Sequence, residues 1–129
     1  MPQDGLAVGV VRAYWSAMQT NDFYRAAECL AEDFVLDWPQ SNERIRGRAN
    51  FAALNSEYPA NGPWRFTVHT IVGNDDEAVS DVSVTDGVQS ARAITFSTVR
   101  DGLIVRQTEF WPESYAAPVN RAHLVESIS

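Results

Sequence analysis

Cysteine is nearly absent from this sequence of 129 residues, which contains only Cys29. A single cysteine cannot form an intrachain disulfide, so the fold has to be stabilised by its apolar core. The chain also lacks an apolar run of the ~20 residues that a membrane-spanning helix needs. Its first residues lack the basic segment and apolar centre of a signal peptide. We therefore expect a cytoplasmic protein without a membrane segment.

Positive charge is scarce as well, because ten Lys and Arg stand against 17 Asp and Glu and the net formal charge is −7. Nucleic-acid binding needs clustered basic residues, and the only such cluster here is Arg44, Arg46 and Arg48. No group of His, Cys, Asp and Glu has the spacing of metal ligands. No glycine-rich phosphate loop and no serine nucleophile elbow occurs. The sequence predicts no nucleic-acid partner, no metal and no cofactor.

Aromatic residues are common, with four tryptophans, four tyrosines and six phenylalanines, and apolar residues make up 45% of the chain. This composition is typical of a globular protein, and the length predicts one domain. So many aromatic side chains in a short chain favour a large aromatic core or an aromatic pocket.

The first half of the chain has its apolar residues at helical spacing. This spacing predicts helices over 5–19, over 23–30 and from Gly47 to a break before Pro59. Asp4 can cap the first helix. A short extended segment is expected over 34–38.

From residue 64 onward the apolar period changes to two, which predicts strands. Asp86-Gly87 and Asp101-Gly102 are hairpin signals between these strands. Helices followed by a run of strands predict an α+β fold, with the helices packed on one face of a curved antiparallel sheet. The expected strands are about 64–72, 77–85, 88–100 and 103–111, and residues 112–129 follow as a terminal arm with a short helix at 119–127.

This order of elements, together with the motifs IRGRANF and TEFWPE, resembles the nuclear-transport-factor-2-like superfamily and, within it, the SnoaL-like polyketide cyclase group. The resemblance implies a cystatin-like α+β cone, in which a curved antiparallel sheet wraps around three N-terminal helices and a pocket. Residues 1–113 would form this single domain, and residues 114–129 a C-terminal arm that packs on the domain or on a partner subunit. The resemblance also implies a homodimer through the sheet, near Arg106, Thr108 and Phe110.

The resemblance does not specify the chemistry, because this fold hosts isomerases, hydrolases, dehydratases, cyclases and binding domains. When the sequence is aligned with the ketosteroid isomerase pattern, Tyr14 aligns with the tyrosine of the oxyanion hole. The two catalytic carboxyl positions fall on Trp38 and Phe96. Steroid isomerisation by that mechanism is therefore not expected.

A second comparison is with the limonene-epoxide-hydrolase branch, which uses an Asp-Arg-Asp set. Glu109-Phe110-Trp111 matches its final-strand motif with Glu in place of Asp. The other two positions fall on Asp81 and Ser83, so the arginine is missing from its place. Arg92 on the next strand is the candidate substitute.

Both comparisons imply the same direction for the side chains of the last three strands. Glu109, Asp81 and Tyr14 are then the catalytic candidates. The full set expected to line the pocket is Tyr14, Trp38, Asp81, Ser83, Arg92, Phe96, Gln107, Glu109 and Trp111.

Glu109 is the leading candidate for a general acid or base. Among tryptophans, its carboxylate would be desolvated and its pKa raised toward neutrality, which suits proton transfer. If Asp81 lay within ~6 Å, the two acids would share a proton. The alternatives are that Glu109 only pairs with Arg92 or Arg106, and that Asp81 and Ser83 face away from the pocket.

The sequence thus predicts a cofactor-free acid–base enzyme, of the isomerase, cyclase, dehydratase or hydrolase type. Its substrate would be small and hydrophobic or aromatic. Two alternatives stay open: a non-catalytic ligand-binding or assembly domain, and an epoxide-hydrolase-like enzyme with an altered triad.

Overall fold

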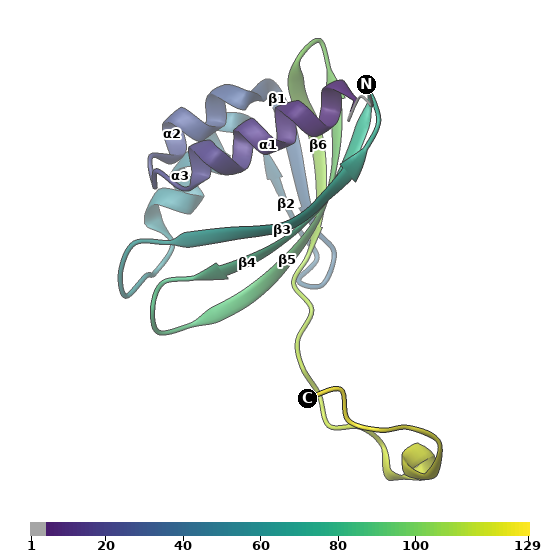
Figure 1. The fold of residues 1–129 in the computed structure, drawn as a ribbon. Coiled ribbons are helices and arrows are strands. Elements are labelled where there is room, and N and C mark those ends of the chain that lie inside the picture. The colour runs from purple at the N-terminus through teal and green to yellow at the C-terminus, as the bar shows by residue number, and fades with distance from the viewer. Residues whose placement is uncertain (1–4) are drawn as a thin grey trace.

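The computed structural model of the chain describes residues 5–129 (Figure 1), so Asp4, the expected helix cap, lies outside the described residues. The helices are α1 (Leu6–Met18), α2 (Phe23–Ala26) and α3 (Arg48–Glu57), with the short 3-10 segments η1 (Ala27–Cys29) and η2 (Val119–Leu124). The strands are β1 (Leu30–Trp38), β2 (Glu43–Arg46), β3 (Arg65–Gly73), β4 (Glu77–Thr85), β5 (Ser90–Arg100) and β6 (Leu103–Phe110).

The six strands form one curved sheet in the order β2-β1-β6-β5-β4-β3, and α1 lies across its concave face (Figure 1). The predicted α+β cone is confirmed. The sheet is mixed rather than wholly antiparallel, because β1 runs parallel to β6. None of the helices within residues 5–129 is long and apolar enough to cross a membrane.

Two local elements differ from the expectation. The helix expected over 23–30 is only one turn, α2, followed by η1, and the chain enters β1 already at Leu30. Strand β2 was not predicted, because Ile45 is its single buried residue and charged residues surround it. One apolar residue gives no periodicity to read.

The concave face of the sheet is covered by α1, which buries an apolar stripe that includes Val8, Val11 and Trp15. The indole nitrogen of Trp15 donates a hydrogen bond to Ser80 Oγ on β4 at 3.0 Å. Since side chains alternate along a strand, Ser80 and Val82 point toward the helix. The intervening residues of β4 therefore point to the convex face.

A β-bulge in β6 sets the direction of the side chains that follow it. Beside the turn, Val99 pairs with Ile104, but the next pair is Thr98 with Arg106, so Val105 has no partner. Opposed residues of an antiparallel pair share a face, and one extra residue shifts every later pairing by one. Leu103 and Val105 therefore do not lie in one row with Gln107 and Glu109.

The C-terminal arm leaves the domain and extends away from it, as Figure 1 shows. The helix expected at 119–127 is the shorter 3-10 segment η2. Tyr115, Val119, Leu124 and Ile128 of the arm are exposed in the described chain. A single chain thus leaves apolar surface of the arm in contact with solvent.

The turn between β4 and β5 is organised by Asp86, whose side chain is buried. Its carboxylate accepts hydrogen bonds from the backbone N–H groups of Val88 (2.9 Å) and Gln89 (2.8 Å). It also accepts one from the backbone N–H of Asn61 (2.8 Å), in the segment that leads into β3. Burial would raise the pKa of Asp86, but these hydrogen bonds outweigh it and hold that pKa well below its ordinary value.

We predict that Asp86→Asn lowers the midpoint of thermal unfolding at pH 7 by several degrees. The depressed pKa means that the carboxylate stabilises the fold above an ordinary aspartate pKa of ~4 and loses this effect as the pH falls. The difference between variant and wild type should therefore shrink in melts recorded below pH ~4. The exposed Asp33→Asn is the matched control and should change neither value. An equal loss at all pH values would contradict the prediction.

Candidate active site

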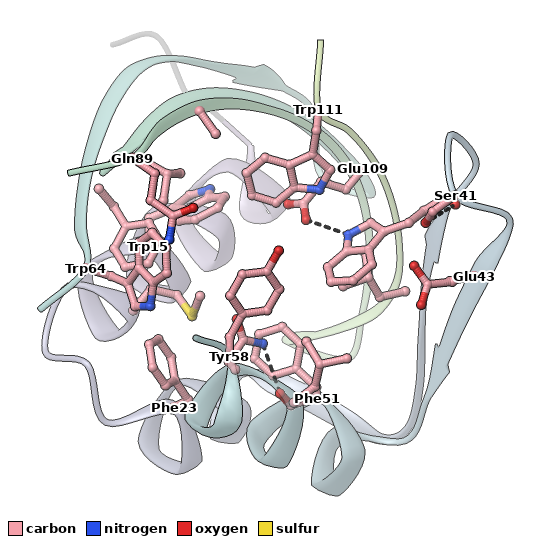
Figure 2. Close-up of a pocket in the computed structure, with 18 of the residues that line it drawn as sticks. Trp15, Phe23, Ser41, Glu43, Phe51, Tyr58, Trp64, Gln89, Glu109 and Trp111 are labelled. Carbon is pink, nitrogen blue, oxygen red and sulfur yellow. Dashed lines mark hydrogen bonds between the residues drawn. The ribbon is translucent and has the colours of Figure 1, made fainter. Parts of the chain in front are cut away.

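A cavity of about 520 Å³ lies between the concave face of the sheet and the helices. All four tryptophans of the chain line it, together with phenylalanines and tyrosines from α1, α2, α3 and β3. Figure 2 shows Glu109 and Trp111 on the wall formed by the sheet, with Phe51 and Tyr58 on the wall formed by α3. The predicted aromatic pocket is therefore present in the structure.

Glu109 is the buried acid of this cavity, with 5% of its surface exposed. Its Oε1 accepts a hydrogen bond from the indole nitrogen of Trp38 at 2.9 Å, and its Oε2 accepts one from Thr95 Oγ1 at 2.6 Å. Burial raises the pKa of Glu109, and the two hydrogen bonds only partly oppose this effect. The carboxyl group therefore keeps its proton to a higher pH than an exposed glutamate does.

The arginines that could have neutralised Glu109 are bound elsewhere. Arg106 donates a hydrogen bond to Asp37 Oδ2 at 2.8 Å, and Arg92 forms an ion pair with Asp81. Within residues 5–129 the hydrogen-bond donors to Glu109 are neutral. The alternative in which Glu109 pairs with Arg92 or Arg106 is wrong.

Tyr14 of α1 also lines the cavity, as predicted, and is buried. Burial raises its pKa well above the ordinary value, and the nearby Glu109 carboxylate raises it further, while a hydrogen bond with Gln107 opposes both. Its hydroxyl group is therefore protonated over the whole physiological range and available as a hydrogen-bond donor.

Gln107 points inward as predicted but is not a wall of the cavity, because it is fully buried beneath it. Its Nε2 donates to Ser97 Oγ at 3.2 Å, and its Oε1 has no partner in the described part of the chain. The expected contact between Gln107 and the substrate is thus wrong. Gln107 acts on Tyr14 instead, because its side chain lowers the pKa of that residue.

Four residues expected in the pocket lie on the convex face of the sheet. Asp81 and Arg92 form a two-pronged ion pair there, with Nη2 to Oδ2 at 2.8 Å, and the hydrogen bond from Arg92 lowers the pKa of Asp81. Ser83 Oγ lies 2.6 Å from Nε2 of His69. Phe96 is 48% exposed.

The bulge at Val105 explains all four errors. If β5 and β6 paired regularly from the Asp101-Gly102 turn onward, Glu109 would pair with Ile94. The odd-numbered residues of β4 would then point into the pocket together with Glu109. With the bulge, Glu109 pairs with Thr95 and Asp81 pairs with Ile94. Asp81 and Glu109 therefore lie on opposite faces and cannot share a proton, and the altered epoxide-hydrolase triad does not form.

Sequence reasoning missed Thr95, which holds the second oxygen of Glu109. It also missed two acidic residues of the cavity lining, Glu43 and Glu113. TEFWPE contains Glu113 two residues after Trp111, which is the one local signal that could have marked it. Among the residues that the structure describes, no group of His, Cys, Asp and Glu could hold a metal ion.

Comparisons with known proteins agree with this architecture. A family model described as a SnoaL-like domain matches residues 11–107. A candidate ketosteroid isomerase from Kribbella flavida is similar, with 36% identity and a TM-score of 0.88 over 96% of this chain and 90% of that chain. No curated protein matches.

Two more distant structures are similar in fold. One is an LEH-like epoxide hydrolase from M. tuberculosis, with 21% identity and a TM-score of 0.69 over 86% of each chain. The other is a candidate SnoaL-like polyketide cyclase from Jannaschia, with 16% identity and a TM-score of 0.69 over 86% of this chain and 88% of that chain.

We predict that Glu109→Gln makes the free energy of unfolding larger at pH 8. The raised pKa means that the wild type loses stability as the pH rises above an ordinary glutamate pKa of ~4.3 and the buried group ionises. Gln keeps the shape and cannot ionise, so the two proteins should converge near pH 4 in urea denaturation. The exposed Glu32→Gln controls for net charge. A constant difference at all pH values would sink the assignment of the raised pKa to Glu109.

Proposed function

The chain belongs to the SnoaL-like domain family, and from this premise we propose that it is a cofactor-free acid–base enzyme acting on a small, largely apolar molecule. The observation that carries the proposal is Glu109, a buried carboxyl group with a raised pKa on the wall of an aromatic cavity. The similar structures described as an isomerase, a hydrolase and a cyclase support this range of reactions and do not choose among them.

Glu109 would take a proton from the substrate and return it. A carboxyl group whose pKa is raised toward the working pH is both a usable base and a usable acid. The hydrogen bonds from Trp38 and Thr95 hold both oxygens in place, which fixes the direction of proton transfer. The aromatic walls keep the site low in water and so strengthen its electrostatic interactions.

Tyr14 would stabilise the negative charge that develops on a substrate oxygen when the proton leaves. Its raised pKa keeps the hydroxyl protonated, so it donates a hydrogen bond rather than a proton. The sequence contains no lysine, so a carbonyl group cannot be activated as a lysine Schiff base. Hydrogen bonding by Tyr14 is then the means of activation that the cavity offers.

The volume supports a small ligand, since about 520 Å³ lies within the ~300–1,000 Å³ that is usual for such pockets. Phe51 and the other aromatic residues of the helical wall would bind its apolar body. One observation favours a second candidate, a ligand-binding domain without catalysis. Both oxygens of Glu109 already have donors, as in a structural carboxyl group.

We predict that Glu109→Gln lowers turnover about 10²–10⁴-fold, the usual contribution of a general acid or base, and leaves ligand binding within a few fold. A general assay is exchange of hydrogen for deuterium beside the carbonyl of bound hydrophobic ketones, followed by NMR. Wild-type exchange should rise with pH through the raised pKa of Glu109, because only the ionised form is a base.

The matched control is Glu32→Gln, which makes the same chemical change on an exposed residue outside the cavity. Ligands that bind both Glu109→Gln and the wild type but are turned over by neither would favour the binding domain. Equal turnover by Glu109→Gln and the wild type would rule out Glu109 as the proton-transfer group.

We also infer a homodimer through the convex face of the sheet. Phe96 and Phe110 lie edge to face there, with ring centroids 6.2 Å apart and planes at 88°. The paired charges of Asp81 and Arg92 lie beside this apolar pair. A half-exposed aromatic pair with a charged rim is typical of the centre of an interface. The apolar side chains of the arm would then pack on the partner subunit.

We predict that Phe96→Asp makes the chain monomeric and leaves its fold intact. A charge at the centre of an apolar interface opposes association, whereas on the surface of a monomer it costs little. Light scattering coupled to gel filtration gives the mass, and far-UV circular dichroism checks the fold. Tyr24→Asp on α2 is the control, because it makes the same aromatic-to-aspartate change on an exposed side chain outside the sheet. A wild type that is monomeric at micromolar concentration would contradict the inference.

A further inference from the structure

The ionisable side chains that line the cavity include several acids and no base within residues 5–129. Glu43, Glu109 and Glu113 line it, and of the residues within 5–129 that form its lining, none is an arginine or a histidine. Arg44, which neighbours Glu43 on β2, donates instead to Asp37, at 3.0 Å from Nη2 to Oδ2. Arg44 is thus held by an acid that does not line the cavity.

The cavity lining that contains these acids also contains two indole rings that meet at a corner. The ring centroids of Trp38 and Trp111 are 6.4 Å apart and their planes meet at 79°. Trp38 directs its indole N–H to Glu109, so its ring is held in place. In Figure 2, Glu43 and Ser41 lie on the side of β2, next to the wall that carries Glu109 and Trp111.

Tryptophan faces together with carboxylates are the groups that recognise organic ammonium ions. The negative face of an indole attracts a cation within ~6 Å of the ring centroid, and this attraction grows when the site is shielded from water. An anion in this cavity would meet the acids Glu43, Glu109 and Glu113 and no basic side chain of the lining, so its desolvation would not be compensated. A neutral ligand would gain no electrostatic attraction from the acidic residues of the cavity.

We propose that the molecule bound in this cavity is an organic cation, an amine or quaternary ammonium group on an apolar body. The positive group lies in the corner of Trp38 and Trp111, between Glu43 and Glu113. The apolar body extends toward Phe51 and the other aromatic residues of the helical wall. This assignment rests on the proposed function for its site, but it concerns binding and not the chemical step.

The charge of the ligand has a consequence for Glu109. A cation in the cavity favours the ionised form of a nearby carboxyl group. Binding therefore drives the proton of Glu109 into solvent and leaves a carboxylate beside the ligand. The substrate itself would produce the base that acts on it, with one proton released for each molecule bound while Glu109 is protonated.

The test compares three ligands of similar shape by isothermal titration calorimetry on the full chain. Benzyltrimethylammonium is the cation, neopentylbenzene is its neutral carbon isostere, and benzylphosphonate is the anion. The cation should bind at least ten times more tightly than the isostere, and the anion should not bind. The preference should weaken as salt is raised, because the rim acids Glu43 and Glu113 are exposed.

Two variants assign the preference to residues. The double change of Glu43→Gln and Glu113→Gln should weaken the cation at least fivefold and leave the isostere unchanged. Glu32→Gln combined with Glu57→Gln is the control, with the same change of net charge at exposed residues outside the cavity. Titrations in buffers of different ionisation enthalpy should detect proton release on cation binding, which Glu109→Gln abolishes.

Binding of the isostere or the phosphonate as tight as that of the cation overturns the inference, as does an equal loss in the control variant. These outcomes leave the proposed function untouched if ketone exchange still depends on Glu109. A clear preference for the cation, with no turnover that Glu109→Gln removes, supports the inference and overturns the proposed function. Absence of binding by all three ligands overturns the inference.

Discussion

The arrangement of the site depends on one unpaired residue, Val105, which forms the bulge in β6. Before it, Ile104 points into the core, and after it Gln107 and Glu109 do. In a regular hairpin the acid would share a face with Asp81 and Arg92, where an arginine would neutralise it. The extra residue instead separates a face of paired charges from an aromatic cavity that holds an unpaired acid. Bulges commonly reorient a side chain at functional sites in this way.

The pKa values of the acidic residues are shifted in opposite directions on the two faces of the sheet. On the convex face, hydrogen bonds and charge from arginines lower the pKa values of Asp37 and Asp81. On the concave face, burial raises the pKa of Glu109. Hydrogen bonds from Trp38 and Thr95 offset only part of the cost of burying this carboxyl group. A group that costs stability in a cavity is expected where function requires it.

The sequence was sufficient for the fold and for part of the site. The turn signals Asp86-Gly87 and Asp101-Gly102 placed the hairpins, and the strand expected at 77–85 has those same bounds. Local patterns carry this information because a hairpin joins neighbouring segments. The parallel pairing of β1 with β6 joins distant segments and leaves no local pattern.

The same reasoning placed Tyr14, Trp38, Glu109 and Trp111 in the cavity, where the structure has them. It misplaced the site residues of β4 and β5 because valine at position 105 is an ordinary strand residue. Glycine in a strand often marks a bulge, whereas the bulge at Val105 contains no glycine. When the direction of a side chain is predicted by counting residues from a turn, the prediction holds only up to the first bulge in the strand.

A cavity with a single buried acid limits the reactions that it can promote. Tyr14 keeps its proton because burial raises its pKa, so in the proposed enzyme Glu109 would act as the base and afterwards as the acid. Isomerisation and cyclisation meet this condition, since the proton removed from one atom of the substrate is returned to another. Hydrolysis needs one group to activate water and another to protonate the leaving group. Asp81 is on the wrong face to be that second group, and the other acids of the lining, Glu43 and Glu113, are exposed rather than buried beside Glu109. If the proposed function is correct, this geometry favours proton transfer within one bound molecule over hydrolysis.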